Sequence, residues 1–113
     1  MSSPPRKILV ADADEIVVAL ISHLLYRHGY SVDIALNADE AAGRLASHPY
    51  DAILLDGAFS GALRRAPELA ARTILLSPKA ADTDLPVHAI LLKPIEFQSL
   101  IDAVNGCAKE SGE

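Results

Sequence analysis

Apolar residues gather along the chain in short runs. Four runs are continuous and aliphatic, namely Lys7–Ala11, Ala52–Leu55, Thr73–Leu76 and Ala89–Leu92. A fifth run, Ser31–Ala35, alternates between apolar and polar side chains. Continuous runs are typical of strands buried on both faces of a parallel sheet, whereas alternation is typical of a half-exposed edge strand. The pattern therefore predicts five strands, and it puts the alternating one at an edge of the sheet.

Apolar residues at helical spacing predict helices between and after these runs. The first helix has its apolar positions at Val17, Leu20, Ile21, Leu24 and Leu25. Gly29 follows this helix and is a natural C-terminal stop. The last helix shows the i, i+3, i+4, i+7 spacing of an amphipathic helix, at Phe97, Leu100, Ile101 and Val104.

A capping box predicts a further helix after the alternating strand. Asn37 is followed three residues later by Glu40, a spacing at which the two side chains cap the first helical turn. We expect this helix to bury its apolar positions, which are Ala38, Ala41, Ala42 and Leu45. Because strands alternate with helices, we predict an α/β fold with a doubly wound, five-stranded parallel sheet.

Two connections between the predicted strands are short. Sixteen residues, 57–72, lie between Asp56 and the fourth run, which leaves room for one short helix beginning at Pro67, where a missing N–H does no harm. Ten residues, Pro78–Val87, lie between Ser77 and His88, the residue before the fifth run, whereas a parallel crossover usually needs about a dozen or more. We therefore predict a shortened third helix and no regular helix beyond a turn in Pro78–Val87, so that the fourth helix is missing or vestigial.

Length and composition exclude several classes of protein. The 113 residues suffice for one domain with its own core, so we predict a single domain over residues 1–113 with an ordered core of about residues 7–108. A net charge of −5 and 4% aromatic residues argue against nucleic-acid binding, which relies on basic patches and stacking side chains. The first residues, MSSPPRK, lack the apolar region of a signal peptide, and no apolar run approaches membrane-spanning length. Since the one cysteine, Cys107, cannot form an internal disulfide, we expect a cytoplasmic protein without membrane contact.

Polar side chains follow four of the predicted strands at the point where each ends. They are Asp12, Asp56, Ser77 and Lys93. Each alone is ordinary, because such residues commonly cap helices or lie on the surface. In a doubly wound sheet, however, ligands bind beyond the carboxyl ends of the strands. Two acids, a hydroxyl and an amine at this one edge therefore predict a functional site.

The segments KILVADADE, YDAILLDGAF, TILLSPKA and AILLKPIEF resemble the response-regulator receiver domain of two-component signalling, over about residues 7–108. The resemblance implies a flavodoxin-like sheet with strand order 2-1-3-4-5. It also implies that Asp56 accepts a phosphoryl group from a histidine kinase or a histidine phosphotransfer protein. Ser77 then contacts the phosphoryl oxygens and Lys93 pairs with the phosphoryl group. The Lys93–Pro94 peptide bond is expected to be cis, as it usually is in this family.

The resemblance further implies a Mg²⁺ ion, which neutralises the anions that meet at the acceptor. Its expected ligands are Asp56, the backbone carbonyl of Ala58, Asp12 and water. The family carries two adjacent acids after the first strand and the second binds the metal directly, but Ala13 stands at that position. Losing one charged contact costs about 1.5–3 kcal/mol, or about 10- to 100-fold in affinity, so we expect weak Mg²⁺ binding. Asp14 is expected to cap the following helix instead.

Three other positions depart from the family pattern. Ser60 stands where the family has a proline shortly after the acceptor, and Ile90 stands where it has an aromatic switch residue. The short connection over Pro78–Val87 removes most of a helix that forms the usual output face. These departures concern the switch more than the fold.

Two functions are compatible with these residues. The first is a phosphorelay receiver that takes a phosphoryl group on Asp56 and signals through protein contacts, with no enzymatic activity beyond its own phosphorylation and dephosphorylation. The alternative is a pseudo-receiver, an interaction module with weak or no Mg²⁺-dependent phosphorylation. A small enzyme built on Asp12, Asp56 and Lys93 is disfavoured because no general base or cofactor loop accompanies them. The sequence identifies neither the cognate kinase nor the oligomeric state, and it fits either a free-standing regulator or part of a larger protein.

Overall fold

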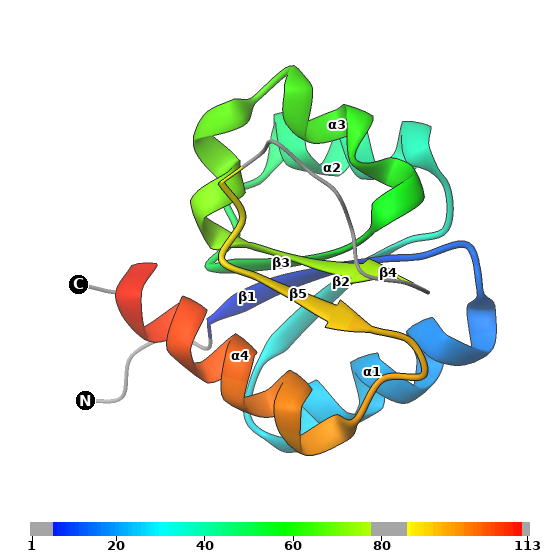
Figure 1. The fold of residues 1–113 in the computed structure, drawn as a ribbon, viewed down its shortest axis with the longest axis vertical. Coiled ribbons are helices and arrows are strands. Elements are labelled where there is room, and N and C mark those ends of the chain that lie inside the picture. Colours follow the sequence, from blue (N-terminus) through cyan, green and yellow to red (C-terminus); the bar gives the residue numbers. More distant parts are fainter. Residues whose placement is uncertain (1–5, 78–85, 112–113) are drawn as a thin grey trace.

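The fold is a five-stranded sheet between two layers of helices (Figure 1). The computed structural model describes residues 6–77 and 86–111. All strands pair in parallel, in the order β2-β1-β3-β4-β5. The strands are β1 Lys7–Ala11, β2 Ser31–Ala35, β3 Ala52–Asp56, β4 Thr73–Ser77 and β5 Ala89–Leu92. The predicted α/β fold, its strand number and its strand order are therefore confirmed.

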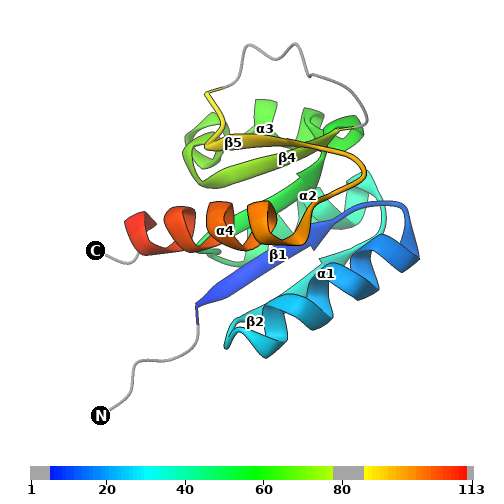
Figure 2. The ribbon, with the colours of Figure 1, turned by 60° about the horizontal axis from the view of Figure 1, so that its bottom comes forward.

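The helices cover both faces of the sheet. Helices α1 (Glu15–Arg27) and α4 (Phe97–Ser111) lie side by side against one face (Figures 1 and 2). The opposite face carries α2, α3 and two 3₁₀ helices. Their bounds are α2 Ala38–Ser47, η1 Gly57–Phe59, α3 Gly61–Arg64 and η2 Pro67–Arg72.

Two apolar layers hold these elements together, one on each face of the sheet. Beneath α1 and α4, the layer includes Val10, Leu54 and Leu76 from three adjacent strands. Beneath α2 and α3, it includes Leu9 and Leu55, the sequence neighbours of two of those residues. Successive side chains of a strand point to opposite faces, so a continuous apolar run fills both layers. This is why β1, β3 and β4 required unbroken aliphatic sequence.

The helix ends follow the predicted capping signals closely. Gly29 lies just beyond α1 with φ +89°, a conformation that favours glycine. Asn37 Oδ1 accepts the N–H of Glu40 at 2.8 Å, as the capping box requires. Glu40 Oε1, however, accepts the N–H of Leu36 at 2.7 Å rather than that of Asn37. The second hydrogen bond of the capping box is therefore made by the residue before the N-cap, not by the N-cap itself.

Some residues of the predicted apolar helix faces lie outside the core. Leu20 is 53% exposed and Phe97 is 46% exposed, while Val18, which was not in the predicted set, is buried. Ala38 is exposed because it begins α2, so the prediction that it is buried was wrong. Helical spacing predicts that a face exists, but it does not fix how far the neighbouring element extends along it.

The third connection contains only short helices. Helix α3 spans four residues, and η2 begins at Pro67 as a 3₁₀ helix, so the predicted shortening is confirmed. Most of the fourth connection, residues 78–85, lies outside the described residues, and so does the prediction that Pro78–Val87 contains no regular helix. Residues 86–88, which are described, belong to no helix or strand.

Candidate functional site

The four predicted site residues meet at the carboxyl edge of the sheet. Asp12 directly follows β1, Asp56 ends β3, Ser77 ends β4 and Lys93 directly follows β5. The strand register aligns these ends, because Ser77 pairs with Leu92, the residue before Lys93. The backbone N–H of Lys93 also donates to the carbonyl of Ser77 at 2.6 Å. The sheet therefore brings together residues that the sequence separates by most of its length.

Lys93 bridges the two acids. Its Nζ lies 2.7 Å from Asp12 Oδ2 and 3.3 Å from Asp56 Oδ2. The Asp12 side chain is 2% exposed, the Asp56 side chain 15% and the Lys93 side chain 24%. Lys93 thus supplies a positive charge to a carboxylate that has almost no access to water. Asp56 is the more accessible of the two acids.

Backbone N–H groups occupy the other oxygen of each acid. Asp12 Oδ1 accepts the N–H of Asp14 at 2.9 Å, and Asp56 Oδ1 accepts the N–H of Ala58 at 2.9 Å. Each carboxylate therefore directs one oxygen to the backbone of the loop that follows it and the other oxygen to Lys93. Asp12 Oδ2 contacts the lysine as an ion pair only, and among the described residues it has no hydrogen-bond partner.

These contacts determine the charge of the lysine. Burial acts to lower the pKa of the Lys93 ammonium, but the hydrogen bond and charge of Asp12, followed by those of Asp56, outweigh it. The pKa of Lys93 is therefore raised, and the lysine is positively charged across the neutral range.

Asp14 belongs to the start of α1, as the sequence predicted. Its Oδ1 accepts the N–H groups of Ile16 and Val17 at 3.0 and 3.2 Å, which makes it the N-cap. Ala13, between Asp12 and Asp14, is exposed and has no side-chain oxygen to offer the pocket. The pocket therefore receives one acid from this loop.

Ser77 lies against the loop that follows Asp56. Ser77 is buried, with 7% of the residue exposed. A Cβ placed on Gly57 would lie 4.0 Å from Ser77 Oγ and 3.6 Å from the carbonyl oxygen of Leu76. Gly57 thus lets the backbone next to Asp56 pass close to the end of β4. Ser77 and the residue after Asp56 therefore lie close together at this edge of the sheet.

This donor set fits a divalent cation poorly. Among residues 6–77 and 86–111, no group of three or more His, Cys, Asp or Glu side chains could hold a metal ion. The Oδ2 atoms of Asp12 and Asp56 both contact Lys93. Ala13 stands where the resemblance leads one to expect a third acid. Mg²⁺ prefers six oxygen ligands in an octahedron. The ligand set expected from the resemblance would require the ammonium to withdraw first.

Two other positions that depart from the family pattern lie in β5 and at the end of η1. Ile90, in β5, is half-buried against the apolar layer under α2 and α3. Ser60 ends η1 and precedes α3. The Lys93–Pro94 peptide bond is cis, as the resemblance implied.

An apolar groove of about 530 Å³ adjoins the pocket, and sequence reasoning missed it. It runs between α1 and the segment that joins β5 to α4. Its lining residues are Asp14, Val17, Leu20, Ile21, Lys93, Pro94, Ile95 and Phe97. The exposed Leu20 and Phe97 form part of its wall. The sequence did contain a signal for the groove. Leu20 and Phe97 both belong to predicted apolar helix faces, and the helices leave both side chains exposed.

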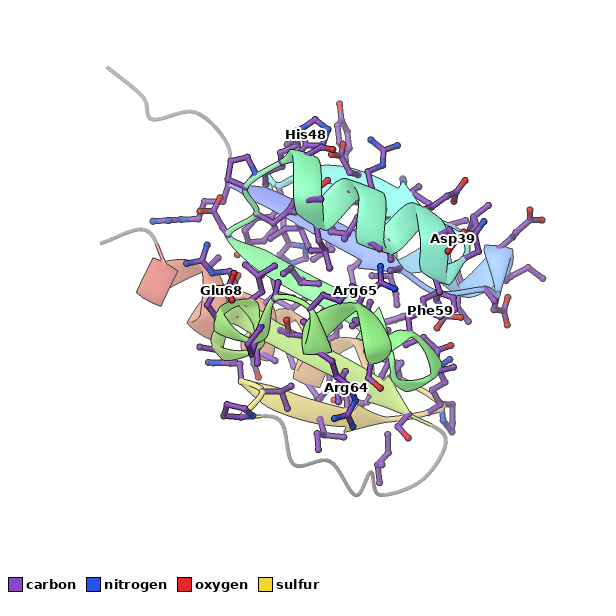
Figure 3. The ribbon with its side chains drawn as sticks, turned by 90° about the horizontal axis from the view of Figure 1, so that it is seen from above. Asp39, His48, Phe59, Arg64, Arg65 and Glu68 are labelled. Atoms are coloured by element: carbon purple, nitrogen blue, oxygen red, sulfur yellow. The ribbon has the colours of Figure 1, made fainter. Side chains whose placement is uncertain are left out.

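A second hollow, of about 240 Å³, lies on the opposite face between α2 and α3 (Figure 3). Its polar lining residues, Asp39 and Arg65, are both exposed, and Phe59 lies near the beginning of α2. Small side chains make up most of the rest. None of the described residues lining it is a buried polar group, so it offers no chemistry comparable to that of Lys93 and the two acids.

Comparisons with known proteins identify the fold. No protein-family model matches the chain, and no curated protein sequence matches it. Among solved structures, a CheY-like receiver domain from Methanospirillum hungatei has a TM-score of 0.86 at 20% identity, covering 96% of this chain and 97% of that one. A two-component response regulator from Clostridium difficile has a TM-score of 0.83 at 22% identity, with coverages of 96% and 99%.

A third similar structure is that of a complex. The response regulator TrrA from Thermotoga maritima, in complex with Mg²⁺-BeF, has a TM-score of 0.76 at 27% identity, covering 90% of this chain and 98% of that one. Many of the similar structures are response-regulator receiver domains. The chain therefore has the receiver-domain fold, as its sequence predicted. No helix in the described part of the chain is long and apolar enough to cross a membrane.

Proposed function

We propose that this chain is a phosphorelay receiver, in which Asp56 accepts a phosphoryl group from a histidine kinase or a histidine phosphotransfer protein. The observation that carries the proposal is the contact of the Lys93 ammonium with Asp56, at the strand edge where Ser77 also ends its strand. A cation held against a partly accessible carboxylate suits an acid that must take up more negative charge. The chain would act in the cytoplasm, where its single thiol stays reduced.

Three side chains of the pocket take part in the transfer, namely Asp56, Lys93 and Ser77. Asp56 Oδ2 attacks the phosphorus of a phosphohistidine, forming an O–P bond while the P–N bond breaks and its electron pair returns to the imidazole. Lys93 stabilises the charge on the new aspartyl phosphate, because it already lies 3.3 Å from the attacking oxygen. In this proposal the Ser77 hydroxyl donates a hydrogen bond to a phosphoryl oxygen. No separate substrate is turned over.

The donor would dock along the apolar groove beside the pocket. The groove is lined by Lys93 itself and by the exposed Leu20 and Phe97. A protein whose phosphohistidine reaches Asp56 must cover this surface, and burying apolar side chains there stabilises the encounter. We therefore assign the groove to the phosphodonor protein.

Backbone amide NMR with the phosphoryl mimic beryllofluoride tests the role of Asp56. We expect saturable shifts at the amides around Asp56, Ser77 and Lys93, recorded with and without Mg²⁺. The shifts should vanish in Asp56→Ala and persist in Asp39→Ala, which removes an exposed acid from α2. No shifts in the wild type under either condition would overturn the proposal.

The groove assignment is tested by comparing two kinds of donor. Leu20→Glu should slow phosphotransfer from autophosphorylated histidine kinases, tested as a panel, by about tenfold or more. The same variant should react normally with phosphoramidate, which is too small to need the groove. Tyr26→Glu, 74% exposed near the other end of α1, serves as the control. Equal effects of both variants would argue against the groove.

A second candidate is the pseudo-receiver, and Ala13 is the observation that favours it. Without the acid that this position carries in the family, the pocket has one fewer ligand for a metal ion. In that case the chain would bind its partner protein through its surface, with weak or no phosphorylation of Asp56. A wild type that binds a histidine kinase but shows neither beryllofluoride shifts nor phosphoramidate labelling would establish this second function.

A further inference from the structure

Lys93 and a divalent cation would compete for the same carboxylate oxygens. We propose that Lys93 is the resident cation of this pocket, so that the ammonium rather than a metal ion neutralises Asp12 and Asp56. This inference rests on the proposed function, since it concerns the same pocket. It goes beyond the loss of a ligand at Ala13. The weak Mg²⁺ binding that we expect then has a second cause, the Lys93 ammonium that already contacts both acids.

The first argument is the use of the oxygens. The backbone holds Asp12 Oδ1 and Asp56 Oδ1 at 2.9 Å each, through the N–H groups of Asp14 and Ala58. Lys93 holds both Oδ2 atoms, at 2.7 and 3.3 Å. A metal ion bound to either Oδ2 atom would share that oxygen with the Lys93 ammonium, which places two positive centres next to each other. Withdrawal of the ammonium gives up the ion pair with Asp12 and the hydrogen bond with Asp56.

The second argument is the supply of other ligands. The exposed Ala13 offers no oxygen, and Asp14 has committed its Oδ1 to the N–H groups at the start of α1. Ala13 therefore cannot supply a ligand at all. Asp14 could supply its capping oxygen only by giving up the cap of α1. The described part of the chain offers no other cluster of acids for the purpose.

The third argument is charge. Two carboxylates and one ammonium leave the pocket with a net charge of −1, counted from Asp12, Asp56 and Lys93. A divalent cation entering without displacing the lysine would bring two positive centres within a few ångströms of each other. That repulsion opposes metal binding more strongly in a partly buried pocket than in water. Lys93 must then withdraw, and Asp12, which is 1% exposed, loses its partner.

Metal titrations of the full chain test this inference. Mg²⁺ is followed by amide shifts, and Mn²⁺ by paramagnetic broadening of the signals near Asp56. The wild type should bind both ions weakly. Lys93→Met should bind them about tenfold more tightly, because the competing charge is gone. Ala13→Asp should gain about 10- to 100-fold from one added charged ligand.

A second measurement covers the case in which Lys93→Met does not fold. In Ala13→Asp, bound Mg²⁺ should displace the ammonium, so the Lys93 Hε signals should shift as the ion saturates. Ala19→Asp adds an acid to the exposed side of α1 and should gain nothing. The inference is overturned if the wild type binds Mg²⁺ as tightly as Ala13→Asp does. It is also overturned if metal binding leaves the Lys93 signals unchanged.

These outcomes are separate from those of the proposed function. Metal binding is read without any phosphorylation, so tight Mg²⁺ binding by the wild type overturns the role of Lys93 and leaves phosphorylation of Asp56 intact. Conversely, absence of beryllofluoride shifts overturns the receiver proposal while the competition between Lys93 and the ion is still measured.

Discussion

The ammonium of Lys93 lies 2.7 Å from Oδ2 of Asp12, and Asp12 is the most deeply buried acid of the pocket, with 1% of its surface exposed. The two residues come from opposite ends of the chain. Their contact joins the loop after β1 to the loop after β5, across β3, which carries Asp56, and β4. It therefore belongs to the stability of the domain as well as to its chemistry.

Removal of the lysine should destabilise the fold. Lys93→Met leaves the Asp12 carboxylate buried without its cation, so the free energy of unfolding should fall by about 1–3 kcal/mol at neutral pH. Urea denaturation of the two chains measures the difference. Arg65→Met removes an exposed cation and should change stability by less than about 0.5 kcal/mol. Equal losses in both variants would contradict a structural role for the Lys93–Asp12 pair.

Asp14 should contribute to stability and not to the chemistry of the pocket. Asp14→Ala removes the N-cap of α1 and should cost about 1 kcal/mol, whereas Asp14→Asn keeps a capping oxygen and should cost little. Both variants should react with phosphoramidate at the wild-type rate. A lower rate in both would mean that Asp14 serves the pocket, in place of the acid missing at Ala13.

A hydrogen bond between Tyr50 and Asp33, which lies in β2, should make the stability of the fold depend on pH. The Tyr50 hydroxyl donates to Asp33 Oδ2 at 2.7 Å, and Lys7 lies 3.4 Å from the same oxygen. Burial acts to raise the pKa of Asp33, but these partners outweigh it and the pKa is lowered below 3.8. Burial, followed by the bond to Asp33, raises the pKa of Tyr50 above its ordinary value of 10.0.

The sign of the pH effect follows from these two shifts. The lowered pKa of Asp33 stabilises the fold above pH 3.8, and this contribution is lost as the pH falls through the folded value. The raised pKa of Tyr50 stabilises the fold below pH 10.0, and this contribution is lost as the pH rises further. Tyr50→Phe should therefore be less stable than the wild type by about 0.5–1.5 kcal/mol at neutral pH, with a smaller gap at both extremes.

Urea denaturation across the pH range measures this gap. Tyr26→Phe, at a tyrosine that is 74% exposed, should track the wild type throughout. A gap for Tyr50→Phe that stays constant from neutral pH to below pH 3.8 would show that Asp33 does not take part.

Two glycines should respond to alanine with opposite signs. Gly29→Ala places a side chain at φ +89° and should cost about 1–2 kcal/mol, although nothing lies within 4 Å of the added Cβ. Gly43→Ala lies inside α2 with nothing within 4 Å, and it should add about 0.5–1 kcal/mol. Thermal or urea unfolding of both variants tests the pair. Equal effects would mean that the backbone conformation at Gly29 is not required.

Much of the fold was predictable because its signals are local. Continuous aliphatic runs marked β3 and β4, and Asn37 and Gly29 marked helix ends through side-chain and backbone geometry that operates over a few residues. The grouping of Asp56 with Lys93 was also predictable, since parallel strands end at a common edge. What these residues do remains a prediction from the resemblance.

The remainder depends on distances between elements, which no local signal carries. The exposure of Leu20 and Phe97 follows from where α4 begins relative to α1, and the groove between these helices follows from that placement. The bridge from Lys93 to Asp12 likewise depends on the path of the loop after β5. Sequence spacing put the lysine at the correct edge but did not choose its partner.

The central claim is that Asp56 is a phosphoacceptor whose pocket carries its own cation, Lys93. Intact-mass spectrometry after incubation with phosphoramidate, in EDTA and in Mg²⁺, tests it most directly. We predict that the wild type gains one phosphoryl group in both conditions, at similar rates, and that Asp56→Asn gains none. Labelling of the wild type only in Mg²⁺, no labelling in either condition, or labelling of Asp56→Asn to the same extent would contradict the claim.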